Sequence, residues 1–252
     1  MKIVAIGGGE IGRPRKEGGF YPVETLTIDR EIIRLTGKEH PKLLFLPTAS
    51  GDSEGYYKVV EKYFGGKLGC KVDVLNLIKE KYSRKETAER IFGSDIVYVG
   101  GGNTMKMLKV WRTLGVDDIL REAGEKGVIL SGLSAGAICW FNYGNSDSLK
   151  FSSGSNKVIR LRGLGFVSLT ACPHYDFEKN RKSSLSRMIR EHGGIALALD
   201  NCAAIEVVDD TYRIVVSKPG AKAYKVYKIG NKVRQEVIPI RKEFSPLEEL
   251  TS

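Results

Sequence analysis

The order in which apolar runs follow one another constrains the fold more than any other feature of this sequence. Short runs rich in β-branched residues alternate with longer amphipathic runs, a pattern typical of a parallel sheet covered by helices. We therefore predict a three-layer α/β fold, with helices on both faces of a mostly parallel sheet. The predicted strands are residues 2–6, 42–48, 71–77, 95–100, 127–132 and 166–172, and the predicted helices are 24–36, 54–66, 84–92, 103–113, 116–125, 135–142 and about 178–191.

The C-terminal part of the chain changes character. Residues 211–242 alternate polar and apolar side chains around the turns KPGA and IGN, which predicts antiparallel strands at the edge of the sheet. Residues 243–252 are expected to form a loose tail. Because no repeat or linker interrupts the pattern, we predict one α/β domain over residues 1–252, with a core at about 1–210.

Composition excludes several classes of protein. The net charge is +10, but the 40 basic residues are interleaved with 30 acidic ones and form no dense block, so no nucleic-acid partner is expected. The N-terminus lacks the pattern of a signal peptide, and no apolar run approaches the roughly 20 residues that span a bilayer. The four cysteines form no CxxC pair. We expect a cytoplasmic protein with no membrane partner, no metal site and no cofactor.

Three predicted strands end in glycine-rich segments, GGGEIG at 7–12, GGGNT at 100–104 and GLSAG at 132–136. Ligands of open parallel sheets bind at the carboxyl ends of the strands, so these segments carry the most information about function. The first has the spacing of a dinucleotide loop, but Pro14 and the absence of a suitably placed acidic residue favour a plain tight turn. In the second, Asn103 or Thr104 can cap the helix, which leaves backbone N–H groups free for an anion or a polarised carbonyl.

The segment GLSAG fits the nucleophile elbow G-x-S-x-G. In such an elbow a strained turn between strand and helix exposes the serine oxygen, and the flanking glycines avoid collisions across the turn. The pattern therefore predicts Ser134 as a nucleophile. The N–H of Ala135, at the start of the next helix, is placed to help bind a developing oxyanion.

A serine needs a base, and the chain has only three histidines. His174 follows the predicted strand 166–172, on the same face as Ser134, whereas the other two are expected at the surface. A carboxylate should orient His174, and three acidic residues are candidates: Asp147, Asp176 and Asp200. Spacing does not decide between them.

These segments resemble the peptidase E family of aspartyl dipeptidases, to which the cyanophycinases are related. The matching pieces are VGGGNT, GLSAGA, SDS after the elbow helix and PHYD, in the family's order, and the resemblance covers most of residues 1–210. It implies a fold like the class I glutamine amidotransferases and a serine peptidase that acts through an acyl-enzyme. The implied substrates are small peptides, either Asp-X dipeptides or aspartyl peptides like cyanophycin.

The resemblance also implies roles for individual residues. Ser134 would be the nucleophile, His174 the base, and the N–H groups of Gly102 and Ala135 the oxyanion hole. Asp147 matches the Asp placed third in the family. Some relatives instead have a Glu where this chain has Asn201, and because this chain lacks that Glu, Asp147 is preferred to Asp200 as the carboxylate that orients His174. Asp176 matches the amidotransferase pattern of a carboxylate two residues after the histidine.

An aspartyl substrate requires a cation in the pocket. Arg181, Lys182 and Arg187 follow the His174 segment, and we choose Arg181 as the ligand of the substrate carboxylate. Gly101 and Asn103 are also expected to bind substrate, and the chain could form a homodimer. Two alternatives to a peptidase are a non-catalytic binder of small molecules with the same fold and an esterase of the α/β-hydrolase type.

Overall fold

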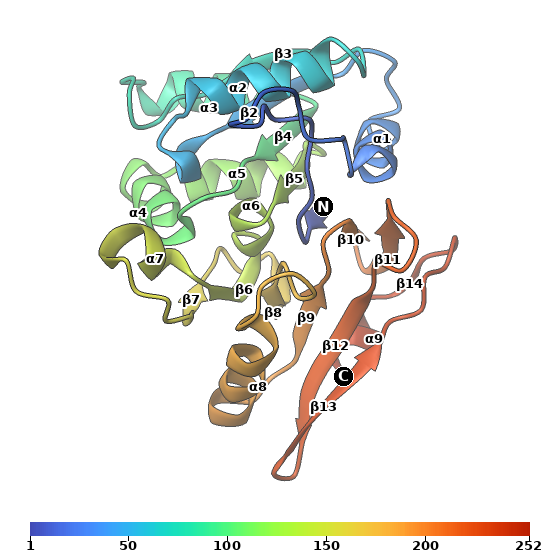
Figure 1. Cartoon of the computed structure of the whole chain (residues 1–252). Helices are drawn as coiled ribbons and strands as arrows, with labels where there is room; N and C mark the ends of the chain where they lie inside the picture. The colour runs from blue at the N-terminus through green and yellow to red at the C-terminus, as the bar shows by residue number, and fades with distance from the viewer.

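A central sheet of parallel strands organises the first half of the chain. The computed structural model describes residues 1–252, and Figure 1 shows these strands between two groups of helices. The parallel strands lie in the order β1, β5, β4, β2, β3, and three antiparallel strands continue the sheet beyond β1 in the order β10, β11, β14. Their bounds are β1 (Lys2–Ile6), β2 (Lys42–Leu46), β3 (Lys71–Val74), β4 (Ile96–Val99), β5 (Ile129–Leu133), β10 (Ala203–Val208), β11 (Thr211–Val216) and β14 (Ser245–Pro246).

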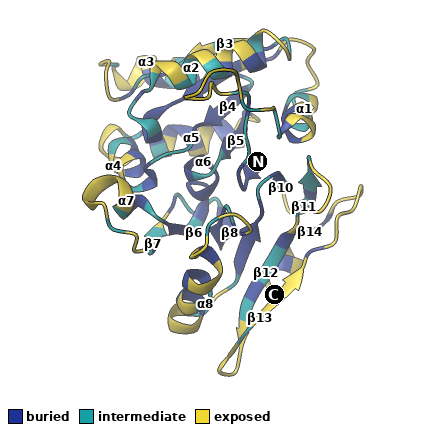
Figure 2. Cartoon of the chain, viewed as in Figure 1, coloured by how far each residue is buried: buried dark blue, intermediate teal, exposed yellow.

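Alternate residues of β1 face opposite sides of this sheet, as the pleat requires. Val4 and Ile6 join an apolar cluster with α1 (Leu26–Arg34), α2 (Glu54–Val60) and the π-helical turn that continues α2 to Gly65. Ile3 and Ala5 join a second cluster that holds α3 (Arg84–Phe92), α4 (Thr104–Leu114), α5 (Val116–Glu125) and α6 (Ala135–Ile138). Figure 2 shows the strands buried between these helices. The predicted fold class, with helices on both faces and antiparallel strands at the edge, is confirmed.

A second sheet, which the sequence did not predict as separate, follows α6. Its strands lie in the order β13, β12, β9, β8, β6, β7, and its middle strands β9, β8 and β6 are parallel. The bounds are β6 (Phe141–Ser146), β7 (Ile159–Arg162), β8 (Val167–Cys172), β9 (Ala196–Leu199), β12 (Ala223–Ile229) and β13 (Lys232–Val237), with α7 (Ser148–Ser153) after β6 and α8 (Arg181–His192) against β8, β9 and β12. The predicted C-terminal strands are therefore divided, because β11 pairs in the first sheet and the β12–β13 hairpin in the second.

The helix after Ser134 is shorter than predicted. We expected residues 135–142, but α6 ends at Ile138 and β6 begins at Phe141. In a longer helix, the carbonyls of Cys139 and Trp140 would lie in the last helical turn. Here they accept N–H groups of the segment that leads into β8. Tertiary pairing thus overrides the local helical preference.

The C-terminal tail is ordered rather than loose. Residues Thr211 and Tyr212 of β11 pair with β14, and the short helix α9 (Glu248–Thr251) follows. Leu250 is 3% exposed and belongs to the same apolar cluster as Tyr212. The sequence signal was weak because a single apolar side chain in a polar segment has no periodicity.

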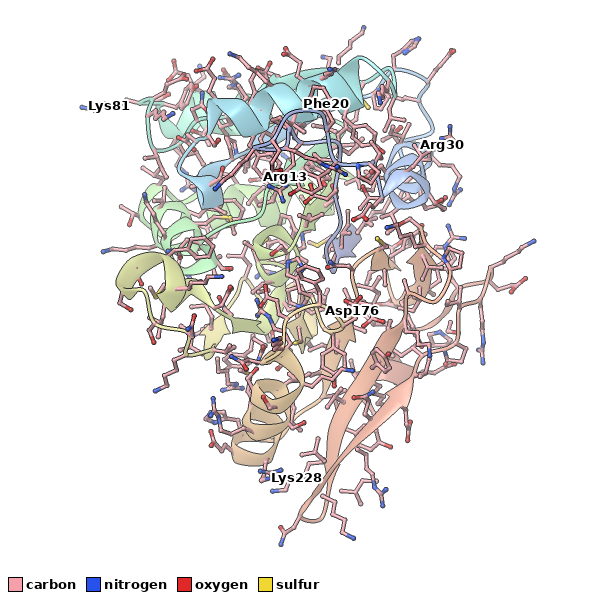
Figure 3. The ribbon with its side chains drawn as sticks, viewed as in Figure 1. Arg13, Phe20, Arg30, Lys81, Asp176 and Lys228 are labelled. Carbon is pink, nitrogen blue, oxygen red and sulfur yellow. The ribbon has the colours of Figure 1, made fainter.

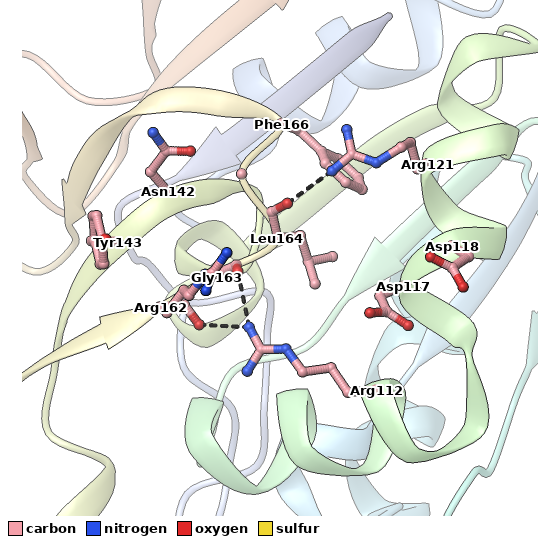
Figure 4. A pocket seen from close by; sticks show the side chains of 11 residues that line it. Arg112, Asp117, Asp118, Arg121, Asn142, Tyr143, Arg162, Gly163, Leu164 and Phe166 are labelled. Carbon is pink, nitrogen blue, oxygen red and sulfur yellow. Dashed lines mark hydrogen bonds between the residues drawn. The ribbon is translucent and has the colours of Figure 1, made fainter.

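Two arginines of α4 and α5 fasten the segment between β7 and β8. Arg112 donates to the carbonyls of Arg162 and Gly163, both at 2.9 Å. Arg121 donates to the carbonyl of Leu164 at 3.0 Å and stacks over the ring of Phe166. Figure 4 shows these contacts in a cavity of about 590 Å³ that contains none of the predicted site residues. None of the helices has the length and apolar character needed to cross a membrane.

Leu250→Ala should lower the free energy of unfolding by about 2 kcal/mol, because truncating a buried leucine leaves a cavity in the core. Urea unfolding of the wild type and the variant measures this difference. Thr251→Ala, at an exposed neighbour, is the matched control and should change the free energy of unfolding by less than about 0.5 kcal/mol. Equal stability of Leu250→Ala and wild type would contradict an ordered tail.

Candidate active site

Three consecutive carbonyls at the end of β1 hold the segments that form the site. Ile6 O accepts the N–H of Ser134 at 3.0 Å, Gly7 O accepts that of His174 at 3.0 Å, and Gly8 O accepts that of Cys202 at 2.8 Å. These N–H groups belong to the ends of β5, β8 and β9, which lie in two different sheets. The first glycine segment is therefore the point at which the site is assembled, and more than the plain turn we predicted.

Ser134 lies in the strained conformation of an elbow. Its backbone has φ 59° and ψ −107°, which few residues other than glycine adopt, at a cost of about 1–3 kcal/mol. The turn joins the end of β5 to the start of α6. A side chain at Gly136 would collide with the backbone, since its Cβ would lie 2.2 Å from Val99 O. The strained turn between strand and helix that we predicted at GLSAG is present in the structure.

A line of hydrogen bonds connects Ser134, His174 and Asn201. His174 Nε2 lies 2.8 Å from Ser134 Oγ, and His174 Nδ1 lies 2.7 Å from Asn201 Oδ1. Because an amide oxygen only accepts, Nδ1 carries the proton and Nε2 presents its lone pair to the serine hydroxyl. This is the tautomer in which a histidine can act as a base toward Ser134.

Gly8 leaves the space in which the His174–Asn201 pair lies. A Cβ at this position would be 2.0 Å from Asn201 Oδ1 and 2.5 Å from His174 Nδ1. Any side chain here would push apart the two atoms that form the hydrogen bond. The second glycine of GGGEIG is thus required because the backbone at Gly8 passes close to His174 and Asn201. This contact explains the glycine without a bound nucleotide.

None of the three carboxylates predicted to orient His174 bonds to it. Asp176 Oδ1 accepts the backbone N–H of Asn201 at 2.8 Å. It therefore holds Asn201, the residue that bonds to His174 in place of a carboxylate. Asp200 is buried, and its Oδ2 accepts the N–H of Lys222 at 3.0 Å. Asp147, our first choice, pairs instead with Arg181 at 3.2 Å. The physical reason is the position of Asn201, whose side chain already occupies the space beside Nδ1.

Arg181, which we predicted to bind the substrate carboxylate, is instead buried against other protein groups. Its side chain is 2% exposed and is held by Glu178 at 2.7 Å, by the carbonyl of Asn145 at 2.5 Å and by Asp147. Every arm of the guanidinium therefore has a protein partner. Together with Asp147 it fixes the start of α8 against the end of β6.

Burial controls the protonation of His174. Removal of the imidazole from water lowers the pKa of His174 below its usual value, and the hydrogen bond that Nδ1–H donates to Asn201 opposes this effect only in part. More distant charges act in both directions, Glu178 and Asp147 raising the pKa and Arg181 lowering it. The imidazole is accordingly neutral, and able to accept a proton, at neutral pH.

Two backbone N–H groups, one in the glycine segment after β4 and one at the start of α6, have no protein partner. Gly102 and Ala135 both lack an acceptor among the hydrogen bonds of the chain. Asn103 does not join them, because it is buried and its Oδ1 caps α4 by accepting the N–H of Lys106 at 3.0 Å. The capping role predicted for Asn103 is confirmed, whereas its predicted place in the substrate pocket is not.

The reactive pair opens into a cavity of about 510 Å³. The cavity wall contains Gly101, which we predicted to bind substrate, and the polar residues Glu10, Arg13 and Tyr56, which sequence reasoning missed. Glu10 and Arg13 belong to the arm, residues 10–24, which folds back on itself through the bridges Ile11↔Val23 and Pro14↔Phe20. Figure 3 labels Arg13 and Phe20 on this arm. The place of Glu10 and Arg13 in the segment that follows β1 is the one sequence signal that could have indicated these residues.

Comparisons of the sequence with known proteins show its family and relatives. The model of peptidase family S51 matches residues 18–215. An uncharacterized peptidase, YgaJ, of Bacillus subtilis strain 168 is 35% identical over 244 residues, which are 95% of this chain and 98% of the relative. A second uncharacterized peptidase, Lmo0363 of Listeria monocytogenes, is 28% identical over 154 residues, covering 60% of this chain and 73% of the relative.

Solved structures share the fold. A crystal structure of a peptidase from an acI-B1 Actinobacterium superposes with a TM-score of 0.69 at 17% identity, covering 97% of this chain and 96% of the other. A putative peptidase E protein from Listeria monocytogenes EGD-e gives a TM-score of 0.57 at 17% identity, over 94% and 98% of the two chains.

Asn201→Asp should raise the pKa of His174 by about 1–3 units, because a carboxylate beside Nδ1 favours the imidazolium form. Titration of the His174 ring protons by NMR measures this pKa directly. Asp147→Asn is the matched comparison and should move the pKa only slightly, and downward, because Asp147 lies farther away and its charge raises the pKa. The reverse ranking of the two variants would show that Asp147 orients His174.

Proposed function

The chain belongs to peptidase family S51, and from that premise we propose that it is a serine peptidase that hydrolyses short peptides through an acyl-enzyme. The observation that carries this proposal is the 2.8 Å contact between Ser134 Oγ and His174 Nε2 at a strained elbow. A surface serine gains nothing from such an arrangement, whereas a nucleophile needs both exposure and a base.

In the acylation step, Ser134 Oγ attacks the carbonyl carbon of the peptide bond while its proton passes to His174 Nε2. The C–N bond then breaks, and Nε2 returns the proton to the departing amine. What remains is an ester between Ser134 and the acyl part of the substrate. The unpartnered N–H groups of Gly102 and Ala135 are the donors available to the oxygen that carries negative charge in between.

In the deacylation step, water attacks the ester carbonyl and gives a proton to His174 Nε2. The bond to Ser134 Oγ breaks, and the serine recovers its proton from the imidazolium. Asn201 accepts from Nδ1–H throughout and fixes the ring, but its neutral amide stabilises the imidazolium less than a carboxylate does. The proposed base, His174, is therefore uncharged before the reaction, because it is buried and its partner is neutral.

We assign the role of substrate cation to Arg13 in place of Arg181. Arg13 Nε bonds to both carboxylate oxygens of Glu10, at 2.8 and 2.9 Å, and the guanidinium stacks over the ring of Tyr21. These contacts fix its plane and leave both terminal nitrogens without a protein partner. A planar pair of N–H donors suits a carboxylate, as an N-terminal Asp would present. Asp-X dipeptides are accordingly the substrates to be tested first.

Ser134→Ala should abolish hydrolysis of an Asp-X dipeptide, since no other hydroxyl lies beside His174 Nε2. A panel of dipeptides that differ in the first residue, followed by amine release, measures activity and specificity together. Labelling of the wild type by a serine-directed phosphonate, absent in the variant, identifies the nucleophile independently of substrate. Undiminished hydrolysis by Ser134→Ala would refute the proposed nucleophile, and cleavage of p-nitrophenyl esters alone would indicate an esterase.

Arg13→Ala should lower kcat/KM for Asp-X dipeptides by about 10-fold to 100-fold, because a hydrogen bond to a charged group contributes about 1.5–3 kcal/mol. The loss should appear mainly in KM. Arg15→Ala is the matched control, since Arg15 stacks on the same Tyr21 ring but does not line the cavity. An equal loss in both variants would assign the effect to the arm as a whole.

A further inference from the structure

Tyr56, on α2, lies against the glycine segment that follows β4. Its hydroxyl oxygen accepts the backbone N–H of Gly101 at 3.3 Å. The ring meets Phe45 edge to face, with centroids 5.1 Å apart, and a Cβ at Gly100 would lie 2.9 Å from a ring carbon. Packing from two sides and a hydrogen bond at the tip therefore hold the phenol in one orientation.

The phenol is linked to the nucleophile through a single residue. A Cβ built on Gly101 would be 3.5 Å from Ser134 Cβ, so the backbone that Tyr56 contacts lies directly beside the serine side chain. Tyr56, Gly101, Ser134 and His174 all line the same cavity of about 510 Å³. A substrate carbonyl placed over Ser134 would thus lie in the cavity that Tyr56 also lines.

The hydrogen-bond inventory of Tyr56 leaves one donor over. Its oxygen accepts from Gly101, but no protein group accepts the phenolic proton. Burial raises the pKa of Tyr56 above its usual value, so the hydroxyl keeps this proton at neutral pH. An uncommitted donor on the wall of a reaction cavity is available to a ligand, because a buried hydroxyl gains from a partner.

We propose that Tyr56 is a catalytic residue whose hydroxyl donates to the oxygen of the peptide carbonyl that Ser134 attacks. It acts as a third donor beside the N–H groups of Gly102 and Ala135, and the hydrogen bond from Gly101 N–H aligns it. As charge develops on the oxygen, this donor stabilises the transition state more than the bound substrate. The inference rests on the proposed peptidase function and adds a residue to it.

The experiment compares Tyr56→Phe with Tyr57→Phe. Tyr57 is the next residue of α2, but its hydroxyl bonds to Glu61 at 2.9 Å and does not line the cavity. Four quantities are measured: kcat and KM for the best dipeptide of the panel, the rate at which a peptidyl diphenyl phosphonate labels Ser134, and the Kd of that dipeptide in a Ser134→Ala background. Phenylalanine keeps the ring contacts with Phe45, and the thermal midpoint checks that Tyr56→Phe is folded.

Tyr56→Phe should reduce kcat and the labelling rate by about 10-fold to 100-fold, at or below the cost of losing an oxyanion-hole donor. KM and Kd should stay within about 2-fold of the wild type, and Tyr57→Phe should change none of the four values. A purely structural role would instead lower the thermal midpoint and weaken Kd. Wild-type kcat and labelling in Tyr56→Phe would overturn the inference and leave Ser134 as nucleophile. A wild type that is neither active nor labelled would overturn the proposed function as well.

Discussion

The carbonyl groups of residues 6–8 are the constraint on which the site depends. They accept the N–H groups of Ser134, His174 and Cys202, three residues that arrive from distant parts of the chain and from both sheets. Each of these three has a positive φ, so each would relax to a commoner conformation if its hydrogen bond were lost. One strand end thus determines where Ser134, His174 and the segment carrying Asn201 lie relative to one another.

The neutral amide of Asn201 gives this site an unusual electrostatic balance. A carboxylate at Nδ1 would hold the histidine ring and also stabilise its positive charge, whereas the amide performs only the first task. Because burial also disfavours the charged ring, the proton that His174 accepts is held weakly. In the mechanism that we propose, such a base takes the proton of Ser134 less readily and returns it to the leaving amine more readily. The donors around the oxyanion must then supply a larger share of the stabilisation.

Sequence reasoning located Ser134 and His174 because both follow strands whose apolar patterns were clear, and strand ends share one edge of a sheet. It failed at Asn201 for a chemical reason, since the search was for a carboxylate and an amide was set aside. It failed at Arg181 because a helix pattern does not reveal that a neighbouring segment supplies Asp147 and Asn145 as partners. The separate second sheet was also missed, because the sheet that each strand after α6 joins depends on contacts that no local pattern encodes.

The arm of residues 10–24 begins directly after the carbonyls that assemble the site. Gly7 and Gly8 have almost no freedom to change, because a side chain at Gly7 would collide with the backbone of Asp200 and one at Gly8 would enter the space between His174 and Asn201. The arm is under no such restriction, since it touches the reacting groups only through the cavity that it lines. Under the function that we propose, chemistry and selectivity are therefore carried by adjacent but separable stretches of one chain. Descendants of this protein could acquire new substrates by altering the arm while the reaction itself stayed the same.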